Sequence, residues 1–600
     1  MTTDHSDAAD PSVPNLQKLE SNLARVEELT QRMLAAMGRK RNIPTSLQGP
    51  GQDLYVKAAS AWMAEMMSNP GKLLEHQIGW WGKTVKHYVE AQHKLAHGDL
   101  TPPEDETPRD KRFSNPLWET HPWFNFIKQQ YLFNAEAIEK TVEDIDGMDA
   151  REKKRLAYFS RQIVDMMSPT NFLGTNPDAL EKAVATEGAS LVKGLENLVA
   201  DLEANGGDLV VTLADREAFK VGENLATTPG KVVYRNRLFE LIQYTPTTDE
   251  VHSTPLIIFP PWINKFYILD LKAQNSFIKW VVGQGYTVFV VSWVNPDVSY
   301  RDVSMSDYIE EGFLTAIREA KAICGTRKVN AIGYCIAGTT LSLTLALMKA
   351  RKDTSVASAT FFTTLTDFSD QGEVGVFLDD DFVDGIEAEV RETGILDSFF
   401  MSRTFSYLRS NDLIYQPAIK SYMMGEAPPA FDLLYWNSDS TNMPKDVYLF
   451  YLREFYQHNN LSNGRLVVDD VKIDLARVKV PVFMQSGEKD HIAPFRSIYR
   501  SAKLYGGPVT FMLAGSGHIA GVINHPAKKK YHYRTNENLP DTVEAWLGGA
   551  EKHDYSWWPY WLKWLDRHGT GRKVPARKPG DAGLDIIENA PGSYVLAKSD

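Results

Sequence analysis

The chain has 600 residues, a formal net charge of −12, and 43% hydrophobic and 24% charged residues. This length predicts two or more domains, and the composition is that of a globular protein. The negative charge argues against a dominant nucleic-acid-binding role. The two cysteines are too few for a disulfide framework and fit a reducing cytoplasm. We find no apolar run of about 18 residues and expect no transmembrane segment, and the polar, acidic start is unlike a secretory signal.

The N-terminal third is predicted to be helical. Residues 1–15 read as a disordered tail. Apolar residues between Leu16 and Met33 then recur at steps of three and four, which predicts an amphipathic helix. A polar, proline-bearing connector covers residues 98–112, and helical periodicity returns from Asn115 to about Leu202. We therefore expect a helical N-terminal domain over residues 16–225.

Strand signals begin near Lys231. Residues 231–246 have the β-branched and aromatic alternation of a hairpin. Short apolar runs separated by helix-like segments follow, and they indicate an α/β domain with a mostly parallel sheet covered on both faces. These runs are "PLIIFPPW" (255–262), "YTVFVVSW" (286–293), "VNAIGY" (329–334), "SATFFTTL" (358–365), "VPVFMQSG" (480–487) and "PVTFMLAG" (508–515).

The predicted α/β domain spans residues 226–575 and contains an insertion. Between about residues 366 and 470 the strand rhythm is lost, and the segment is helical and rich in aromatic residues. An insertion between two sheet strands is where an active-site cap would lie. Residues 576–600 are polar and contain glycine and proline, so we interpret them as a C-terminal tail.

A cysteine occupies the turn between one predicted strand and a helix. The turn reads Gly333-Tyr334-Cys335-Ile336-Ala337-Gly338, a G-x-nucleophile-x-G elbow with cysteine in the usual serine position. The sharp bend crowds the backbone on both sides of the nucleophile, which explains the paired glycines. The alternative is a buried structural cysteine ahead of a core helix. Cys324 has no such setting, and we interpret it as an ordinary residue.

An acid and a histidine follow the cysteine in the order that this elbow fold requires. Asp490 comes after the strand at 480–487, and His518 lies in a glycine-rich loop after the strand at 508–515. His518 would take the thiol proton, and Asp490 would hold the imidazole and stabilise its charged form. His491 adjoins the acid and competes for the base role, but it is poorly placed to point the same way.

Two backbone N–H groups should form an oxyanion hole. One belongs to Ile336, directly after the nucleophile. The second should follow the strand at 255–262, where the double proline cannot donate, so it falls to Trp262 or Ile263, of which we favour Ile263.

A cysteine nucleophile suits acyl transfer. A thioester substrate would acylate Cys335 with little change in free energy, and the acyl group would remain activated for an alcohol acceptor. A helical, aromatic cap would exclude water. Cysteine hydrolases with the same elbow remain an alternative. The chain has no Walker loop, dinucleotide fingerprint or metal-spaced His/Cys cluster, so we expect no metal and no cofactor.

The sequence resembles the class I poly(3-hydroxyalkanoate) synthases from about Ser114 onward. The resemblance rests on "SPTNFLGTNP", "PPWINKFYILDL", "GYTVFVVSWVNPD", "GYCIAGT", "RTFSYLRSNDL", "FDLLYWNSDSTNMP", "DHIAP" and "GSGHIAGVINHP". It implies an α/β-hydrolase fold and a polymerase that takes (R)-3-hydroxyacyl-CoA and releases CoA. The class I layout favours short-chain monomers such as 3-hydroxybutyryl-CoA. Trp262 stands where many relatives have a cysteine, and "NHP" replaces the commoner "NPP" after His518.

The resemblance also implies roles for further residues and partners. Cys335 would be the nucleophile, His518 the base and Asp490 the supporting acid, while Arg409, Asn459 and His491 match positions suspected of contacting CoA. The growing polyester would stay on the cysteine. Family members act as homodimers at the surface of cytoplasmic polymer granules, with granule-associated proteins as further partners. A non-catalytic granule-binding protein is the alternative from a different class.

Two segments allow more than one interpretation. "SWWPYWLKWL" (556–565) carries four tryptophans that would contact the polymer granule, or else form a core-packing or dimer-contact helix. The helix at residues 16–34 would recruit granule-coating proteins, support dimerisation, or simply pack on its neighbours.

Overall fold

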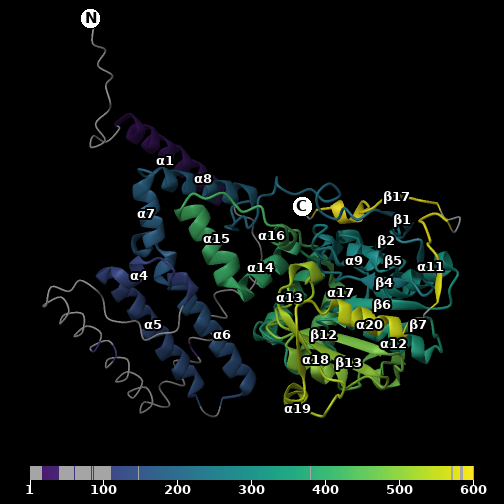
Figure 1. Cartoon of the computed structure of the whole chain (residues 1–600). Coiled ribbons are helices and arrows are strands. Elements are labelled where there is room, and N and C mark those ends of the chain that lie inside the picture. Colours follow the sequence, from purple (N-terminus) through teal and green to yellow (C-terminus); the bar gives the residue numbers. More distant parts are fainter. Residues whose placement is uncertain are drawn as a thin grey trace, which may run out of the picture. The chain divides into compact units, whose positions relative to one another are not determined.

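The computed structural model describes residues 16–39, 60, 83, 86, 110–145, 148–378, 380–568, 572–581 and 585–598. The predicted tail at 1–15 and most of the connector at 98–112 lie outside these residues. The chain divides into two compact units (Figure 1). Among the described residues, the first unit holds those up to Asp215 together with Arg409–Pro429, and the second holds Arg216–Leu408 and those from Ala430 on.

The first unit is built from helices, as the sequence predicts. Its helix α1 coincides with the predicted amphipathic helix and packs along α8. Two ion pairs join the helices: Arg25 of α1 lies 2.8 Å from Glu196 of α8, and Arg32 of α1 lies 2.7 Å from Glu203 of α8. This contact matches the interpretation of α1 as a helix packed on its neighbours. The helices are α1 (Leu16–Met37), η2 (Lys111–Phe113), α4 (Leu117–Thr120), α5 (Pro122–Glu143), α6 (Ala150–Met166), η3 (Pro169–Asn171), η4 (Leu173–Thr175), α7 (Pro177–Ala185) and α8 (Ala189–Ala204).

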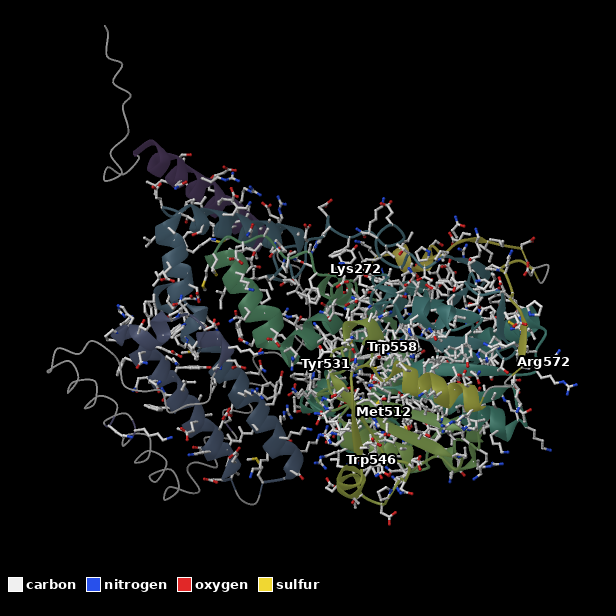
Figure 2. All side chains as sticks on the ribbon, viewed as in Figure 1. Lys272, Met512, Tyr531, Trp546, Trp558 and Arg572 are labelled. Atoms are coloured by element: carbon white, nitrogen blue, oxygen red, sulfur yellow. The ribbon has the colours of Figure 1, made fainter. Side chains whose placement is uncertain are left out.

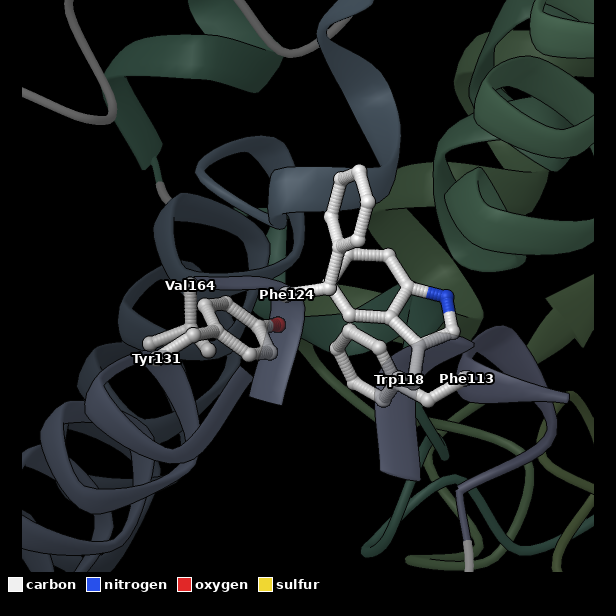
Figure 3. Close-up of a cluster of buried hydrophobic side chains, with 5 residues drawn as sticks. All are labelled: Phe113, Trp118, Phe124, Tyr131 and Val164. Carbon is white, nitrogen blue, oxygen red and sulfur yellow. The ribbon is translucent and has the colours of Figure 1, made fainter. Parts of the chain in front are cut away.

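A cluster of aromatic side chains forms one core of this unit (Figure 3). The rings of Phe113 and Trp118 meet edge to face at 4.9 Å, and Phe124 meets Trp118 in the same way at 5.7 Å. Tyr131 and Val164 complete the cluster from α5 and α6. Such contacts explain why the aromatic run at residues 122–133 folds as a buried helix face.

The segment Arg409–Pro429 joins the first unit although it lies within the predicted cap insertion. It contains η9 (Asn411–Tyr415), α15 (Gln416–Ala418) and η10 (Ile419–Met423). The Tyr422 hydroxyl donates to Asp201 at 2.7 Å, and the Asn197 amide donates to the Ser421 carbonyl at 3.1 Å. A Cβ at Gly194 would lie 2.0 Å from the Tyr422 carbonyl oxygen, so only glycine permits this approach of α8.

The second unit contains an eleven-stranded mixed sheet in the order β15-β14-β13-β12-β7-β6-β4-β5-β2-β1-β17. The middle strands β13 to β5 of this order are parallel, and the strands beyond them on both sides are antiparallel. Each parallel strand coincides with one of the six predicted apolar runs, which confirms that prediction; only β7 begins earlier, two residues before its run. They are β4 (Leu256–Phe259), β5 (Val288–Trp293), β6 (Val329–Tyr334), β7 (Val356–Phe362), β12 (Val482–Gly487) and β13 (Val509–Ala514).

The antiparallel strands extend the sheet at both ends. The predicted hairpin at residues 231–246 is present as β1 and β2, and the segment interpreted as a C-terminal tail supplies β17, which pairs with β1. The N–H of Tyr594 also donates to the buried carboxylate of Glu240 on β2, so this segment is bound to the sheet. These antiparallel strands are β1 (Gly230–Arg235), β2 (Phe239–Tyr244), β14 (His532–Thr535), β15 (Glu551–Asp554) and β17 (Glu588–Asn589). Outside this sheet, two-stranded sheets join β3 (Glu250–His252) to β16 (Lys573–Pro575), β8 (Ile395–Leu396) to β9 (Met443–Pro444) and β10 (Val467–Val468) to β11 (Val471–Lys472).

Helices connect the parallel strands, and the helix after β6 is buried along most of its length. This helix, α12, is apolar on nearly all sides, as expected of a helix in the centre of a domain. The helices between or after the sheet strands are η5 (Phe266–Asp270), α9 (Phe277–Gly283), η6 (Val298–Tyr300), α10 (Met305–Asp307), η7 (Tyr308–Leu314), α11 (Thr315–Cys324), α12 (Ile336–Ala350), α18 (Phe495–Ala502), η13 (Pro526–Lys528), α19 (Val543–Gly548), α20 (Trp558–His568) and η14 (Tyr594–Leu596).

The insertion between β7 and β12 is helical, in agreement with the sequence pattern. Its part within the second unit contains η8 (Val374–Val376), α13 (Asp380–Thr393), α14 (Ser398–Leu408), α16 (Asp432–Asn437), α17 (Lys445–Phe450), η11 (Tyr451–Gln457) and η12 (Leu475–Arg477). In the part of the chain that the structure describes, no helix has the length and apolar character needed to cross a membrane.

Candidate active site

Cys335 stands at a sharp bend between β6 and α12. Its backbone has φ 53° and ψ −124°, a conformation that residues other than glycine rarely adopt and that costs on the order of 1–3 kcal/mol. The bend is held because the Cys335 N–H donates to the Phe362 carbonyl at 2.8 Å, while the Cys335 carbonyl accepts from the Gly338 N–H at 2.9 Å. The thiol is free and half-buried. This is the geometry of the predicted elbow.

The two glycines of the elbow are required by close packing. A Cβ at Gly333 would lie 2.5 Å from the Cα of Gly338, and a Cβ at Gly338 would lie 2.0 Å from Oγ1 of Thr364. Thr364 is fully buried, and its hydroxyl donates to the Phe362 carbonyl at 3.0 Å. Neither glycine can therefore be replaced without moving the backbone that carries the cysteine.

Asp490 and His518 meet at the carboxyl ends of adjacent strands. Asp490 follows β12 and His518 follows β13, and these two strands are paired in parallel. The Nδ1 atom of His518 lies 2.7 Å from Oδ2 of Asp490. The other oxygen, Oδ1, accepts the N–H groups of Ile492 and Ala493, each at 2.9 Å. The carboxylate is thereby fixed in the orientation that meets the imidazole.

Electrostatics join His518 to Cys335 as well as to Asp490. Burial alone would lower the pKa of His518, but the negative charge of Asp490, the thiolate of Cys335 and hydrogen bonds to both raise that pKa well above its ordinary value. The histidine is therefore held in its charged form when the thiol is ionised. The structure brings Asp490 and His518 into a hydrogen bond and places Cys335 close enough to interact electrostatically with the imidazole.

The backbone around Cys335 offers donors for an oxyanion hole. Ile336 is the first residue of α12, so its N–H has no partner within the helix. The second donor is expected in the turn after β4, at Trp262 or Ile263, and this turn is closed by the Asn264 N–H, which donates to the Pro261 carbonyl at 3.3 Å. Both side chains are buried.

A buried ion pair anchors this turn. The Lys265 Nζ atom lies 2.7 Å from Oδ1 of Asp439, and the Tyr267 hydroxyl donates to Oδ2 at 2.8 Å. The indole of Trp436 on α16 donates to the Lys265 carbonyl at 2.8 Å. Burial lowers the pKa of Lys265, and the Asp439 carboxylate opposes that shift. The insertion is thus bonded directly to the turn that follows β4.

Two tyrosines of the insertion interact electrostatically with Cys335, and sequence reasoning did not single them out. The hydroxyls of Tyr451 and Tyr456 on η11 lie 3.4 Å apart. Burial, and also the negative charge of the Cys335 thiolate, raises the pKa of both well above the ordinary value. The rings of Trp262 and Phe368 pack against Tyr451 at 6.0 and 6.3 Å. The aromatic run "YLREFYQ" was the signal, but its register on a π-helix could not be read from periodicity.

The three residues considered for CoA contacts have different settings. Asn459 holds the loop after β7: its Oδ1 accepts the Phe368 N–H at 3.0 Å and its Nδ2 donates to Asp367 at 3.1 Å. His491 directly follows Asp490, and its carbonyl accepts the Glu373 N–H at 2.9 Å. Arg409 belongs to the first unit, where its exposed side chain lies 3.4 Å from Asp412. Within the described residues, no group of three or more His, Cys, Asp or Glu side chains is arranged to hold a metal ion.

Two protein families match the sequence. The family described as "Poly-beta-hydroxybutyrate polymerase (PhaC) N-terminus" matches residues 109–281, and the family described as "alpha/beta hydrolase fold" matches residues 258–524. The second match agrees with the sheet, the elbow and the order of the three polar residues. The predicted α/β-hydrolase fold with a preceding helical region is confirmed.

Curated relatives are similar over nearly the whole chain. A poly(3-hydroxyalkanoate) polymerase subunit of Rhizobium meliloti is 41% identical over 98% of this chain and 96% of its own length. A poly(3-hydroxyalkanoate) polymerase of Methylorubrum extorquens is 40% identical over 99% of this chain and 100% of its own length. A poly(3-hydroxyalkanoate) polymerase subunit of Cupriavidus necator is 41% identical over 82% of this chain and 83% of its own length.

Proposed function

The chain belongs to the poly(3-hydroxyalkanoate) polymerase family, and from this premise we propose that it polymerises (R)-3-hydroxyacyl-CoA with release of CoA, through a covalent thioester on Cys335. The observation that carries the proposal is the hydrogen bond between Asp490 and His518 at 2.7 Å, together with the electrostatic interaction between His518 and Cys335. The likeness to class I enzymes favours short-chain substrates such as 3-hydroxybutyryl-CoA.

Acylation is the first step. His518 takes the proton of the Cys335 thiol, and the thiolate attacks the carbonyl carbon of the substrate thioester. The negative charge that develops on the carbonyl oxygen is stabilised by the N–H groups of Ile336 and Ile263. When the tetrahedral intermediate collapses, the C–S bond to CoA breaks, and the imidazolium returns its proton to the departing CoA thiolate. One thioester replaces another, so little free energy is lost.

Chain extension is the second step. The 3-hydroxyl of an incoming hydroxyacyl-CoA attacks the acyl group on Cys335, His518 accepts the hydroxyl proton, and an oxygen ester forms as the C–S bond to Cys335 breaks. The lengthened chain, now a CoA thioester, acylates the regenerated Cys335 thiolate as in the first step, and the imidazolium returns its proton to the released CoA. Conversion of a thioester to an oxygen ester is downhill and drives the polymer forward. Asp490 keeps the imidazole oriented and stabilises its charged form in both steps.

Aromatic residues near Cys335 support transfer to an alcohol rather than to water. Tyr451 and Tyr456 interact electrostatically with Cys335, and the rings of Trp262 and Phe368 pack against Tyr451. Because burial raises the pKa of the two tyrosines, their hydroxyls stay protonated and act only as neutral hydrogen-bonding groups. Exclusion of water protects an activated acyl group from hydrolysis. A cysteine hydrolase or depolymerase with the same three residues is the alternative that an experiment must separate.

CoA binding, assembly and location extend the proposal. We assign CoA contacts to Arg409, Asn459 and His491, and we expect a homodimer at the surface of cytoplasmic polymer granules, in contact with granule-associated proteins. These assignments rest on the family resemblance. No metal or other cofactor is needed by the steps above, since CoA enters with the substrate and leaves as product.

The test uses purified enzyme and 3-hydroxybutyryl-CoA, with CoA release followed by a thiol reagent and product size by chromatography. We expect CoA release to be matched by ester-linked polymer. Free 3-hydroxybutyrate as the main product would instead identify a hydrolase. Polymer formation by the Cys335→Ala variant would exclude the cysteine mechanism.

A further inference from the structure

The tryptophan-rich segment near the C-terminus is buried in the second unit. The side chains of Trp557, Trp558 and Trp561 are fully buried, and Trp564 is 7% exposed. Figure 2 shows Trp558 within the densely filled interior of this unit. Of the interpretations that the sequence left open, core packing fits this burial, and contact with a granule surface does not. The polar N–H of each buried indole then needs a specific partner.

Two of these indoles donate to consecutive carbonyls of the loop that carries His518. The Nε1 atom of Trp557 donates to the Gly521 carbonyl at 2.7 Å, and Nε1 of Trp558 donates to the Val522 carbonyl at 2.9 Å. Both hydrogen bonds are buried. Because two adjacent residues at the start of α20 hold adjacent carbonyls, the end of the loop is fixed in both position and orientation.

The loop between β13 and these carbonyls is itself closed. The Gly521 N–H donates to the Gly517 carbonyl at 2.8 Å, and the Ile523 N–H donates to the Ile519 carbonyl at 2.9 Å. His518 lies between the two accepting residues. A displacement of Gly521 or Val522 is therefore transmitted through one short hydrogen-bonded turn to the imidazole.

Trp557 also contacts the residue that holds the nucleophile. Its ring lies 5.3 Å from the ring of Phe362, and the Phe362 carbonyl accepts the N–H of Cys335. Trp557 thus touches the His518 loop through its indole N–H and, through its ring, the residue of β7 that holds the Cys335 backbone.

We propose that Trp557, assisted by Trp558, is a positioning residue that sets the distance between the His518 imidazole and the Cys335 thiol. This role of Trp557 rests on the proposed function in one respect: the proposed function assigns the acyl-transfer reaction to Cys335 and His518. Proton transfer requires the two groups within hydrogen-bonding reach, and a displacement of about 1 Å can lower a rate about a hundredfold. The indole bonds keep that distance fixed while the polymer is repeatedly transferred.

The test replaces each indole by a ring without the N–H. Trp557→Phe and Trp558→Phe are compared with Trp561→Phe, which removes an equally buried indole whose N–H donates to Oγ1 of Thr360 on β7 at 3.0 Å, away from the His518 loop. Every variant is made in a Cys324→Ala background, so that alkylation by iodoacetamide reports on Cys335. The measurements are kcat and KM for 3-hydroxybutyryl-CoA and the pH profile of alkylation.

We expect Trp557→Phe to lower kcat about tenfold or more with KM unchanged, to slow alkylation at neutral pH, and to alter its pH profile. Trp558→Phe gives a smaller change in the same direction, and Trp561→Phe keeps the kcat and alkylation profile of the parent protein. Wild-type values for Trp557→Phe, or equal losses in Trp561→Phe, would overturn the proposal. Replacing Trp557 with benzothienylalanine, which keeps the shape and lacks the N–H, decides the matter if the phenylalanine variant does not fold.

The alkylation arm separates this proposal from the proposed function. Alkylation depends on the Cys335–His518 pair and not on the identity of the acyl substrate. If the parent protein forms no polymer from hydroxyacyl-CoA, the proposed function fails, while the comparison of alkylation profiles still supports or overturns the role of Trp557.

Discussion

The imidazole of His518 meets the carboxylate of Asp490 at 2.7 Å, across the ends of two adjacent parallel strands. The carboxylate cannot rotate freely, because its second oxygen accepts two backbone N–H groups. The imidazole is therefore held with one nitrogen toward Asp490 and the other available to the thiol of Cys335.

Asp490→Asn removes the charge that raises the pKa of His518. The pKa of His518 will fall, so that the imidazolium loses its proton at a lower pH than in the wild-type enzyme. Histidine-selective nitrogen-15 NMR, with the signal assigned by the His518→Gln variant, measures the midpoint. We also expect kcat to fall by about 10³–10⁴-fold, because the imidazole is no longer oriented.

The control for this variant is Glu488→Gln. Glu488 lies two residues earlier and is 3.0 Å from His532, so the variant removes a carboxylate of the same loop without touching His518. The His518 midpoint should stay at its wild-type value in this control. An unchanged midpoint in Asp490→Asn would show that another group raises the pKa.

Gly333→Ala should disrupt the elbow. Its Cβ would lie 2.5 Å from the backbone of Gly338, which cannot move without shifting the first turn of α12. We expect a loss of about 2–3 kcal/mol in the free energy of unfolding and a large fall in kcat. Gly283→Ala is the matched control, since nothing lies within 4 Å of a Cβ there. Urea denaturation of both variants provides the comparison, and a neutral Gly333→Ala would refute the packing argument.

Much of the fold, and the elbow in particular, could be predicted from residue patterns. The parallel strands are continuous apolar runs because both faces of the sheet are covered, and this leaves a clear local signal. Cys335 was recognisable because the bend itself demands glycine two residues away on each side. Asp490 and His518 followed from the rule that loops at the carboxyl ends of parallel strands meet at one edge.

Other features depend on contacts that no local pattern records. The membership of Arg409–Pro429 in the first unit depends on the approach of Tyr422 to Gly194, residues more than two hundred positions apart. The β17 pairing is carried by two residues, too few for a periodic signal. Tyr451 and Tyr456 belong to a π-helix, whose spacing differs from that of an ordinary helix.

Asp439→Ala should destabilise the second unit strongly. It leaves the ammonium of Lys265, whose side chain is 3% exposed, without its carboxylate partner. Loss of one partner from a buried ion pair costs about 3–5 kcal/mol. Denaturant titration measures this loss of unfolding free energy. Asp302→Ala is the control: Asp302 lies 3.2 Å from Lys445, but its side chain is 83% exposed, so its ion pair is in contact with solvent. Equal effects in the two variants would show that the Lys265 pair does not anchor the turn.

Arg409→Ala and His491→Ala test the proposed CoA contacts. Each should raise KM for 3-hydroxybutyryl-CoA about tenfold while kcat changes little, as expected when a charge-assisted hydrogen bond to the substrate is lost. Asn459→Ala should also lower the free energy of unfolding by about 1–3 kcal/mol, because the Phe368 N–H loses its partner.

Arg391→Ala is the control for these three variants. Arg391 is exposed and pairs with Glu387 on the same helix at 2.5 Å, so its removal takes away a surface charge alone. KM should stay at the wild-type value. A wild-type KM in Arg409→Ala and His491→Ala would remove both residues from the CoA site.

The central claim is that Cys335 carries the growing acyl chain, and rapid quenching with mass spectrometry tests it most directly. The enzyme is mixed with 3-hydroxybutyryl-CoA, stopped in acid and digested. We predict that the Cys335 peptide gains 3-hydroxybutyryl units in a hydroxylamine-sensitive linkage, while the peptide of buried Cys324, whose pKa burial raises to about 12, stays unmodified. An unmodified Cys335 peptide in an enzyme that releases CoA and forms polymer would contradict the mechanism.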